Sequence, residues 1–188
     1  MQATGNSNID DWQRVGIRSI VQQTELAKAE GKWLFIWDKT NTLNTFFKYK
    51  GVLCEFYTEV IKVELGRQTP AEALEVVRKD FVNAQRTGDN LMIDLSMTQP
   101  DFFTKYTSED VFPVAKAFNR AEWLNQEVHM RFVKEEENFS IGGLNPGHYV
   151  IQPDFKMSLC SSAENEEHMA AVISKIPCFD QFKCVVVE

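Results

Sequence analysis

The chain has 188 residues, of which 44% are hydrophobic and 12% aromatic, so it has enough apolar surface for the core of a domain. This composition excludes a disordered chain, a collagen-like chain and a disulfide-rich miniprotein. The formal net charge of −7 argues against a nucleic-acid partner bound through bulk positive charge.

The segment before Asp11 is polar, without the basic and apolar regions of a secretory signal, and no run approaches the length that spans a membrane. The four cysteines form no C-x-x-C pair, which is typical of reduced thiols. We therefore expect a cytoplasmic protein with no membrane partner. No linker or repeat interrupts the sequence, so a single α/β domain over residues 1–188 is predicted, with residues 1–8 flexible.

Hydrophobic residues alternate between two periods along the first half of the chain. Helical spacing predicts a helix over residues 8–30, and the unbroken apolar run 33–37 predicts a strand that is covered on both faces. A second helical pattern covers residues 45–65. A capping box with proline at the first helical position, over residues 69–72, begins a third helix that Gly88 ends.

The second half repeats the alternation. Strands are predicted over residues 91–95, 155–160 and 183–187, and a helix is predicted over residues 110–133. The segment Ser161-Ser162-Ala163-Glu164 has the spacing of another capping box, which predicts a helix before the last strand.

Strands that alternate with helices predict a three-layer α/β fold, with a mostly parallel sheet of at least four strands and helices on both faces. Ligands of such sheets bind beyond the carboxyl ends of the strands. The residues expected to be buried are Leu34, Ile36, Phe56, Val60, Leu74, Phe81, Ile93, Leu124, Met157, Leu159, Val172, Val185 and Val187.

The run Leu34-Phe35-Ile36-Trp37-Asp38-Lys39-Thr40-Asn41-Thr42-Leu43 ends a predicted buried strand with an aspartate. It resembles motif I of the haloacid dehalogenase superfamily, and is nearest the D-K-T-G-T-L-T of P-type ATPases. The resemblance implies an Mg²⁺-dependent phosphohydrolase with Asp38 as nucleophile, Thr40 where phosphatases carry a general acid, and Ser161 as the phosphate-binding residue. Asp38 and Asp94 would then share the metal. The alternative is that Asp38 only ends the strand and closes an Asx or ST turn with Thr40 and Asn41.

The order of strands and helices also resembles a P-loop ATPase core, including the motor-type AAA domains, with Asp94 in the place of the Walker B acid. No G-x-x-x-x-G-K-[ST] occurs, and residues 38–51 in its place contain one glycine, at the end. Without the glycines the backbone cannot cradle phosphates. This resemblance implies a degenerate domain, a pseudoenzyme, and by analogy a cytoskeletal or ciliary setting.

The adjacent pair Phe102-Phe103 lies in a polar segment, and neighbouring side chains there point to opposite sides. We expect this pair to contact a protein partner. The preferred hypothesis is therefore a non-catalytic structural or protein-interaction domain, a subunit of a larger cytoskeletal assembly, with no cofactor. The alternative is the Mg²⁺-dependent phosphohydrolase that uses Asp38.

Overall fold

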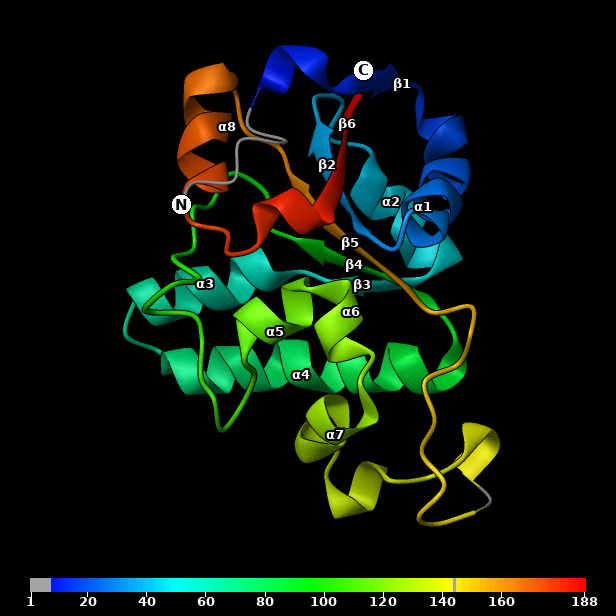
Figure 1. Ribbon diagram of the computed structural model, residues 1–188. Coiled ribbons are helices and arrows are strands. Elements are labelled where there is room, and N and C mark those ends of the chain that lie inside the picture. Colours follow the sequence, from blue (N-terminus) through cyan, green and yellow to red (C-terminus); the bar gives the residue numbers. More distant parts are fainter. Residues whose placement is uncertain (1–7, 144) are drawn as a thin grey trace.

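The computed structural model describes residues 8–143 and 145–188 (Figure 1). Its centre is a six-stranded sheet in the order β1-β6-β2-β5-β4-β3, in which every pairing of neighbouring strands is parallel. The strands are β1 (Gln13–Val15), β2 (Trp33–Asp38), β3 (Val52–Cys54), β4 (Asn90–Asp94), β5 (Lys156–Ser161) and β6 (Phe182–Val187). The predicted α/β fold is confirmed. Residues 1–7, where a flexible start was expected, lie outside the described residues.

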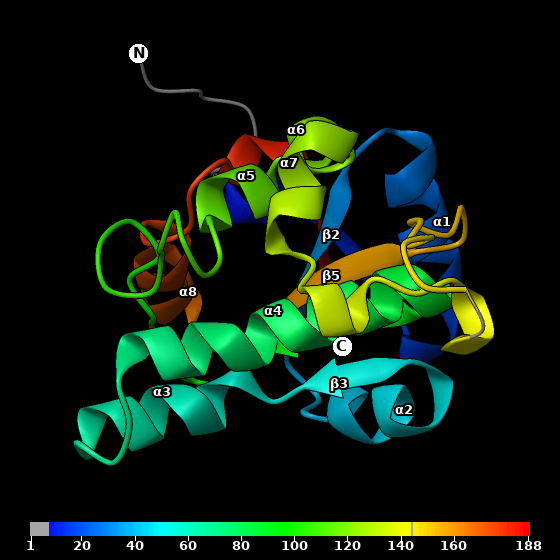
Figure 2. The ribbon, with the colours of Figure 1, turned by 90° about the horizontal axis from the view of Figure 1, so that it is seen from below.

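Helices cover both faces of this sheet (Figure 1). The α-helices are α1 (Ile20–Ala29), α2 (Leu43–Lys50), α3 (Phe56–Glu64), α4 (Pro70–Thr87), α5 (Val114–Phe118), α6 (Arg120–Trp123), α7 (Gln126–His129) and α8 (Glu166–Ile173). Single 3₁₀ turns occur at Ile9–Asp11, Ile17–Ser19, Met130–Phe132, Glu135–Glu137, Ile141–Gly143 and Phe179–Gln181. Helices α1 and α2 pack on one face, and the other α-helices belong to the opposite side, where α3 and α4 lie side by side (Figure 2).

Strand β2 is buried along its whole length, which explains its unbroken apolar sequence. Its tryptophans Trp33 and Trp37 enter the larger cluster beneath α3, α4 and α8, whereas Leu34 and Ile36 enter the smaller cluster beneath α1 and α2. All the residues expected to be buried are buried except Leu124, which is only partly covered. The prediction for Leu124 was therefore wrong.

The predicted helix over residues 45–65 was wrong, because the chain breaks it into α2, β3 and α3. Gly51 ends α2 and brings the backbone against β4. A Cβ atom at this position would lie 2.2 Å from the carbonyl oxygen of Asn90, so only glycine permits the approach. The three residues that follow then pair with β4, with Val52 opposite Leu91.

Two other long helices were also predicted in error. Within residues 8–30, only α1 is helical at length, because Gln13–Val15 pairs with β6 as an edge strand. Within residues 110–133, the chain folds into α5, α6, α7 and a 3₁₀ turn. Asn119 and Asn125 interrupt it, and each caps the next short helix by accepting a backbone N–H bond.

The two predicted capping boxes had different outcomes. At Thr69 both reciprocal hydrogen bonds with Glu72 are present, and α4 ends at Gly88 with a left-handed φ of 79°, so this helix is confirmed. The second box was wrong, because Ser161 still belongs to β5. Helix α8 begins later, at Asn165, whose side chain accepts a bond from the backbone N–H of His168.

Two further findings concern membrane-spanning helices and the cysteines. No helix among the described residues is long and apolar enough to cross a bilayer. All four cysteines are free thiols, and Cys54 and Cys160 are buried.

Candidate functional site

The chain leaves two neighbouring strands on opposite faces of the sheet. β2 continues into α2 on one face, and β5, which pairs directly with β2, continues into α8 on the other. The loops after the two strands therefore diverge and leave a crevice between them. In open parallel sheets such a switch point, at the carboxyl ends of the strands, is the usual position of a ligand site.

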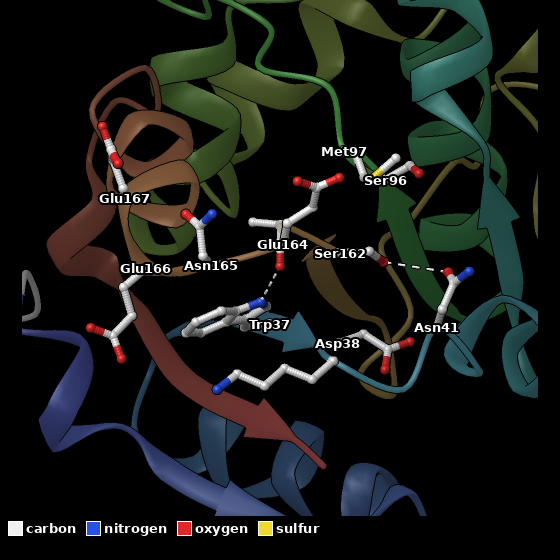
Figure 3. A pocket seen from close by; sticks show the side chains of 12 residues that line it. Trp37, Asp38, Asn41, Ser96, Met97, Ser162, Glu164, Asn165, Glu166 and Glu167 are labelled. Carbon is white, nitrogen blue, oxygen red and sulfur yellow. Dashed lines mark hydrogen bonds between the residues drawn. The ribbon is translucent and has the colours of Figure 1, made fainter.

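A cavity of about 780 Å³ occupies this crevice (Figure 3). Its walls come from three segments that are far apart in the sequence, each following the end of a strand: residues 37–41, 96–97 and 162–167. The indole of Trp37 is fixed by a hydrogen bond from Nε1 to the carbonyl oxygen of Ala163, 2.8 Å away. Ser162 Oγ lies 3.5 Å from Asn41 Oδ1 across the cavity.

The carboxylate of Asp38 is fully engaged by its own loop. Oδ1 accepts bonds from the Thr40 N–H at 2.9 Å and the Thr40 hydroxyl at 2.6 Å. Oδ2 accepts bonds from the backbone N–H groups of Thr42 at 2.9 Å and Leu43 at 3.0 Å. The side chain is 3% exposed. The turn with Thr40 that was the alternative interpretation of Asp38 is thus present.

This arrangement makes Asp38 the anion at the start of α2. Thr42 is the N-cap residue of the helix, but its side chain makes no capping bond, and Asp38 supplies the acceptor from the end of β2. A helix N-terminus attracts anions because its first N–H groups are unpaired and its dipole is positive there. Here the N–H groups of Thr42 and Leu43 already bond to a carboxylate, so these two are not free to hold a phosphate.

Of the other residues of the phosphohydrolase hypothesis, Thr40 bonds directly to the Asp38 carboxylate, whereas Ser161 lies on the opposite face of the sheet. Strand alternation places Trp37 and Ser161 toward the α8 face, because they are paired in register, and it places Asp38 toward the α2 face. Ser161 is buried, and its hydroxyl donates a bond to the carbonyl oxygen of Ser96, 3.1 Å away. Thr40 Oγ1 is shared between Asp38 and the Thr42 hydroxyl.

Asp94 is buried at the end of β4, on the same face as Asp38. Its carboxylate accepts bonds from the Asn44 amide at 2.8 Å and the Ser96 N–H at 2.8 Å. Burial raises the pKa of Asp94, although these two bonds oppose the change. The described part of the chain contains no group of three or more histidine, cysteine, aspartate or glutamate side chains placed to hold a metal ion.

The charges that border the cavity are mostly negative. Glu164, Glu166 and Glu167 belong to the segment that begins α8, and none of them forms an ion pair within residues 8–143 and 145–188. Among the described lining residues Lys39 alone is basic, and its Nζ lies 4.1 Å from the centre of the Trp37 ring. This distance is that of a cation–π contact, so the aromatic wall of the cavity already holds an ammonium group.

Two lining residues have an unusual backbone conformation. Asn41 has a φ of 53° and Ser96 a φ of 49°, in the left-handed region that favours glycine. The Ser96 conformation lets its carbonyl oxygen accept bonds from both Ser161 Oγ and the Ser162 N–H, which joins the loops after β4 and β5. Backbone strain of this kind gathers at binding sites, where the surrounding contacts maintain it.

The structure separates the two phenylalanines that were expected to contact a partner. Phe102 is 4% exposed and stacks on Phe56 with ring centres 5.7 Å apart, so its ring is part of the core and not of a contact surface. Phe103 is 57% exposed. Only Phe103 of the pair is accessible.

Sequence reasoning located this edge of the sheet and considered Asn41 as a turn residue beside Asp38. It did not identify the aromatic wall formed by Trp37 or the acidic wall formed by residues 164–167. A signal was available for Asn41, because asparagine is the commonest non-glycine residue in left-handed turns. Nothing in the sequence shows that Lys39 folds back over Trp37.

The comparisons with known proteins add no relative. No family model, no curated protein and no solved structure matches the chain.

Proposed function

We propose that this chain is a non-catalytic protein-interaction domain that receives a cationic side chain of a partner protein in the switch-point cavity. The observation that carries the proposal is the ammonium group of Lys39 on the ring of Trp37, in a cavity also lined by three glutamates that form no ion pair with any described residue. In the free chain, Lys39 occupies the position that a lysine or arginine of the partner would take. Such a domain would serve as one subunit of a larger assembly, the setting inferred from the motor-type resemblance.

The engagement of Asp38 supports binding over phosphoryl transfer. A nucleophilic aspartate needs a free oxygen facing the phosphorus atom, and all the short bonds of this carboxylate are made to its own loop. The acidic border of the cavity would also repel a phosphate dianion. The same acidic border attracts a cation, and Trp37 gives it an aromatic wall on which to rest.

The test of cation binding uses a short blocked peptide with an arginine and a lysine, and a second peptide with two glutamates in their place. We expect the basic peptide alone to shift the Trp37 indole N–H signal in a ¹⁵N NMR titration. The double variant Glu166→Gln/Glu167→Gln should bind it more weakly. The matched control Glu135→Gln/Glu136→Gln removes the same charge from exposed residues of a distant turn and should bind it normally.

Lys39→Met gives a second readout with the opposite sign. Removing the internal ammonium frees the Trp37 ring, so the basic peptide should bind about two- to fivefold more tightly, as expected from a cation–π contact. Weaker binding by Lys39→Met, or equal binding of the acidic peptide, would contradict the proposal.

A phosphatase assay tests the non-catalytic half of the proposal. With an aryl phosphate and Mg²⁺, we expect the same background rate from the wild type and from Asp38→Asn. Turnover in the wild type that disappears in Asp38→Asn would establish the phosphohydrolase alternative instead.

A further inference from the structure

A second cavity, of about 370 Å³, lies at the opposite end of the sheet, near the amino ends of β2 and β5. Leu124, Val150, Ile151, Pro153 and Phe155 form the apolar part of its walls, and the rest of the lining is polar. No aspartate or glutamate is among its described lining residues, and its one permanently charged residue is Arg120, at the start of α6.

Arg120 has no hydrogen-bond or ion-pair partner within residues 8–143 and 145–188. Its Nε atom is buried without an acceptor, and its guanidinium lies 5.3 Å from the ring centre of Trp33. Burial lowers the pKa of this guanidinium, and no neighbouring carboxylate opposes the change. A partly buried cation of this kind is costly unless an anion pairs with it.

Arg78, on α4, shows how the same fold treats an arginine that belongs to the core. All five of its N–H groups donate a bond, two to Glu75, two to Glu137 and one to the carbonyl oxygen of Phe132, over 2.6–2.8 Å. Hydrogen bonds from Arg78 lower the pKa of Glu75 to about 2. Arg78 is buried with every donor satisfied, whereas the partly buried Arg120 has a buried Nε with no acceptor among the described residues.

The remaining polar groups of the cavity are neutral. His129 is buried, and its Nδ1 lies 3.2 Å from the carbonyl oxygen of Trp123. Burial lowers the pKa of this histidine, so at neutral pH it adds no charge. The amides of Gln126 and Gln152 also line the cavity, and each can donate or accept a bond.

We infer that this cavity binds a small organic carboxylate with an apolar body, whose carboxylate pairs with the Arg120 guanidinium. The planar fork of arginine matches the two oxygens of a carboxylate, and the apolar part of the walls would cover the rest of the molecule. The volume lies within the range of cavities that enclose small ligands. This site is independent of the switch-point cavity and of the function proposed for it.

The test is a titration of the full-length chain in low-chloride buffer with hexanoate, its neutral analogue hexanamide, acetate and sulfate. We expect saturable binding of hexanoate that shifts the Arg120 Nε–H signal in ¹⁵N NMR. Hexanamide and sulfate should bind about tenfold more weakly or worse, because each lacks one half of the recognised chemistry. Acetate should be weaker than hexanoate.

Arg120→Met keeps an apolar side chain and removes the charge, and Arg120→Lys keeps the charge without the planar fork. Affinity for hexanoate should fall in the order wild type, Arg120→Lys, Arg120→Met. Arg67→Met, at an exposed arginine between α3 and α4, should bind as the wild type does. Hexanamide binding as tightly as hexanoate, or unchanged affinity in Arg120→Met, would overturn the inference, and so would sulfate binding as tightly as hexanoate.

Discussion

The buried Asp38 carboxylate lies at the carboxyl end of the sheet, and the partly buried Arg120 guanidinium lies at the amino end. The first receives four hydrogen bonds from its own loop and from the start of α2. The second donates none to the described residues. The protein therefore supplies the donors that pair with the Asp38 carboxylate. For the Arg120 guanidinium, the described residues supply no acceptor.

This difference is the basis of the ligand charge that we propose for each cavity. Where the positive end of α2 is already neutralised by Asp38, the cavity beside it has an acidic border and favours a cation. Where a cation has no counter-charge, the cavity favours an anion. The presence of a cavity alone does not show which ligand charge it prefers. That preference depends on whether the charged group beside the cavity is already paired.

The largest effect should separate the two arginines. Arg78→Met leaves Glu75 and Glu137 without their shared cation and should lower the free energy of unfolding by about 3–5 kcal/mol. Arg120→Met removes a cation that lacks a partner, so the free energy of unfolding should stay the same or rise. Urea denaturation of the two variants measures both, and an equal loss in each would show that Arg120 is paired in solution.

A smaller effect tests the role of Asp38. Asp38→Asn replaces one accepting oxygen by an amide that faces donors, so the free energy of unfolding should fall by about 1–3 kcal/mol. The neighbouring Lys39→Met, at an exposed position, serves as the control and should change stability much less. An Asp38→Asn variant as stable as the wild type would mean that the carboxylate is free and not engaged by the loop.

The sheet was predictable from the sequence, because its four longest strands are short segments rich in apolar residues, and the structure places each within one residue of its predicted bounds. The edge strands Gln13–Val15 and Val52–Cys54 were not predictable in the same way, since three residues are too few to show a period. Gly51 carried the missing signal for the second of them, but its close approach to Asn90 exists only in the folded chain.

The two cavities also differ in how far the sequence predicts them. The carboxyl ends of parallel strands point to a site near Asp38 and Ser162, so its position follows from the strand assignments. No motif marks Arg120, because an arginine in a polar helix is ordinary, and what distinguishes it is the absence of an acceptor in the described structure. The pairing of a charge cannot be read from a sequence until its neighbours are known.

The paired arginine also predicts how stability depends on pH. Because the pKa of Glu75 is about 2 in the folded chain, against an ordinary value of 4.5, the unfolded chain binds more protons between these values. Stability should therefore fall as the pH drops from about 4.5 toward 2. Glu75→Gln should flatten this part of the pH profile of the free energy of unfolding, and Arg120→Met should leave its slope unchanged. A profile that keeps its slope in Glu75→Gln would contradict the ion pair.

The smallest effect concerns the strained loop at the switch-point cavity. Ser96 contributes only backbone bonds, from its N–H to Asp94 and from Ser161 and Ser162 to its carbonyl oxygen, so Ser96→Gly keeps them all. Glycine adopts a φ of 49° without steric cost, and the free energy of unfolding should rise by up to about 1 kcal/mol. Ser174→Gly, in ordinary helical conformation after α8, should be destabilising instead.

One NMR experiment compares both ends of the sheet directly. A ¹⁵N-labelled sample of the chain is titrated in parallel with hexanoate and with the basic peptide, and the Arg120 Nε–H and Trp37 Nε1–H signals are followed in each series. We expect hexanoate to shift the Arg120 signal and leave that of Trp37 in place, and the basic peptide to do the reverse. Shifts of the Trp37 signal with hexanoate, or of the Arg120 signal with the basic peptide, would contradict the opposite charge preferences of the two cavities.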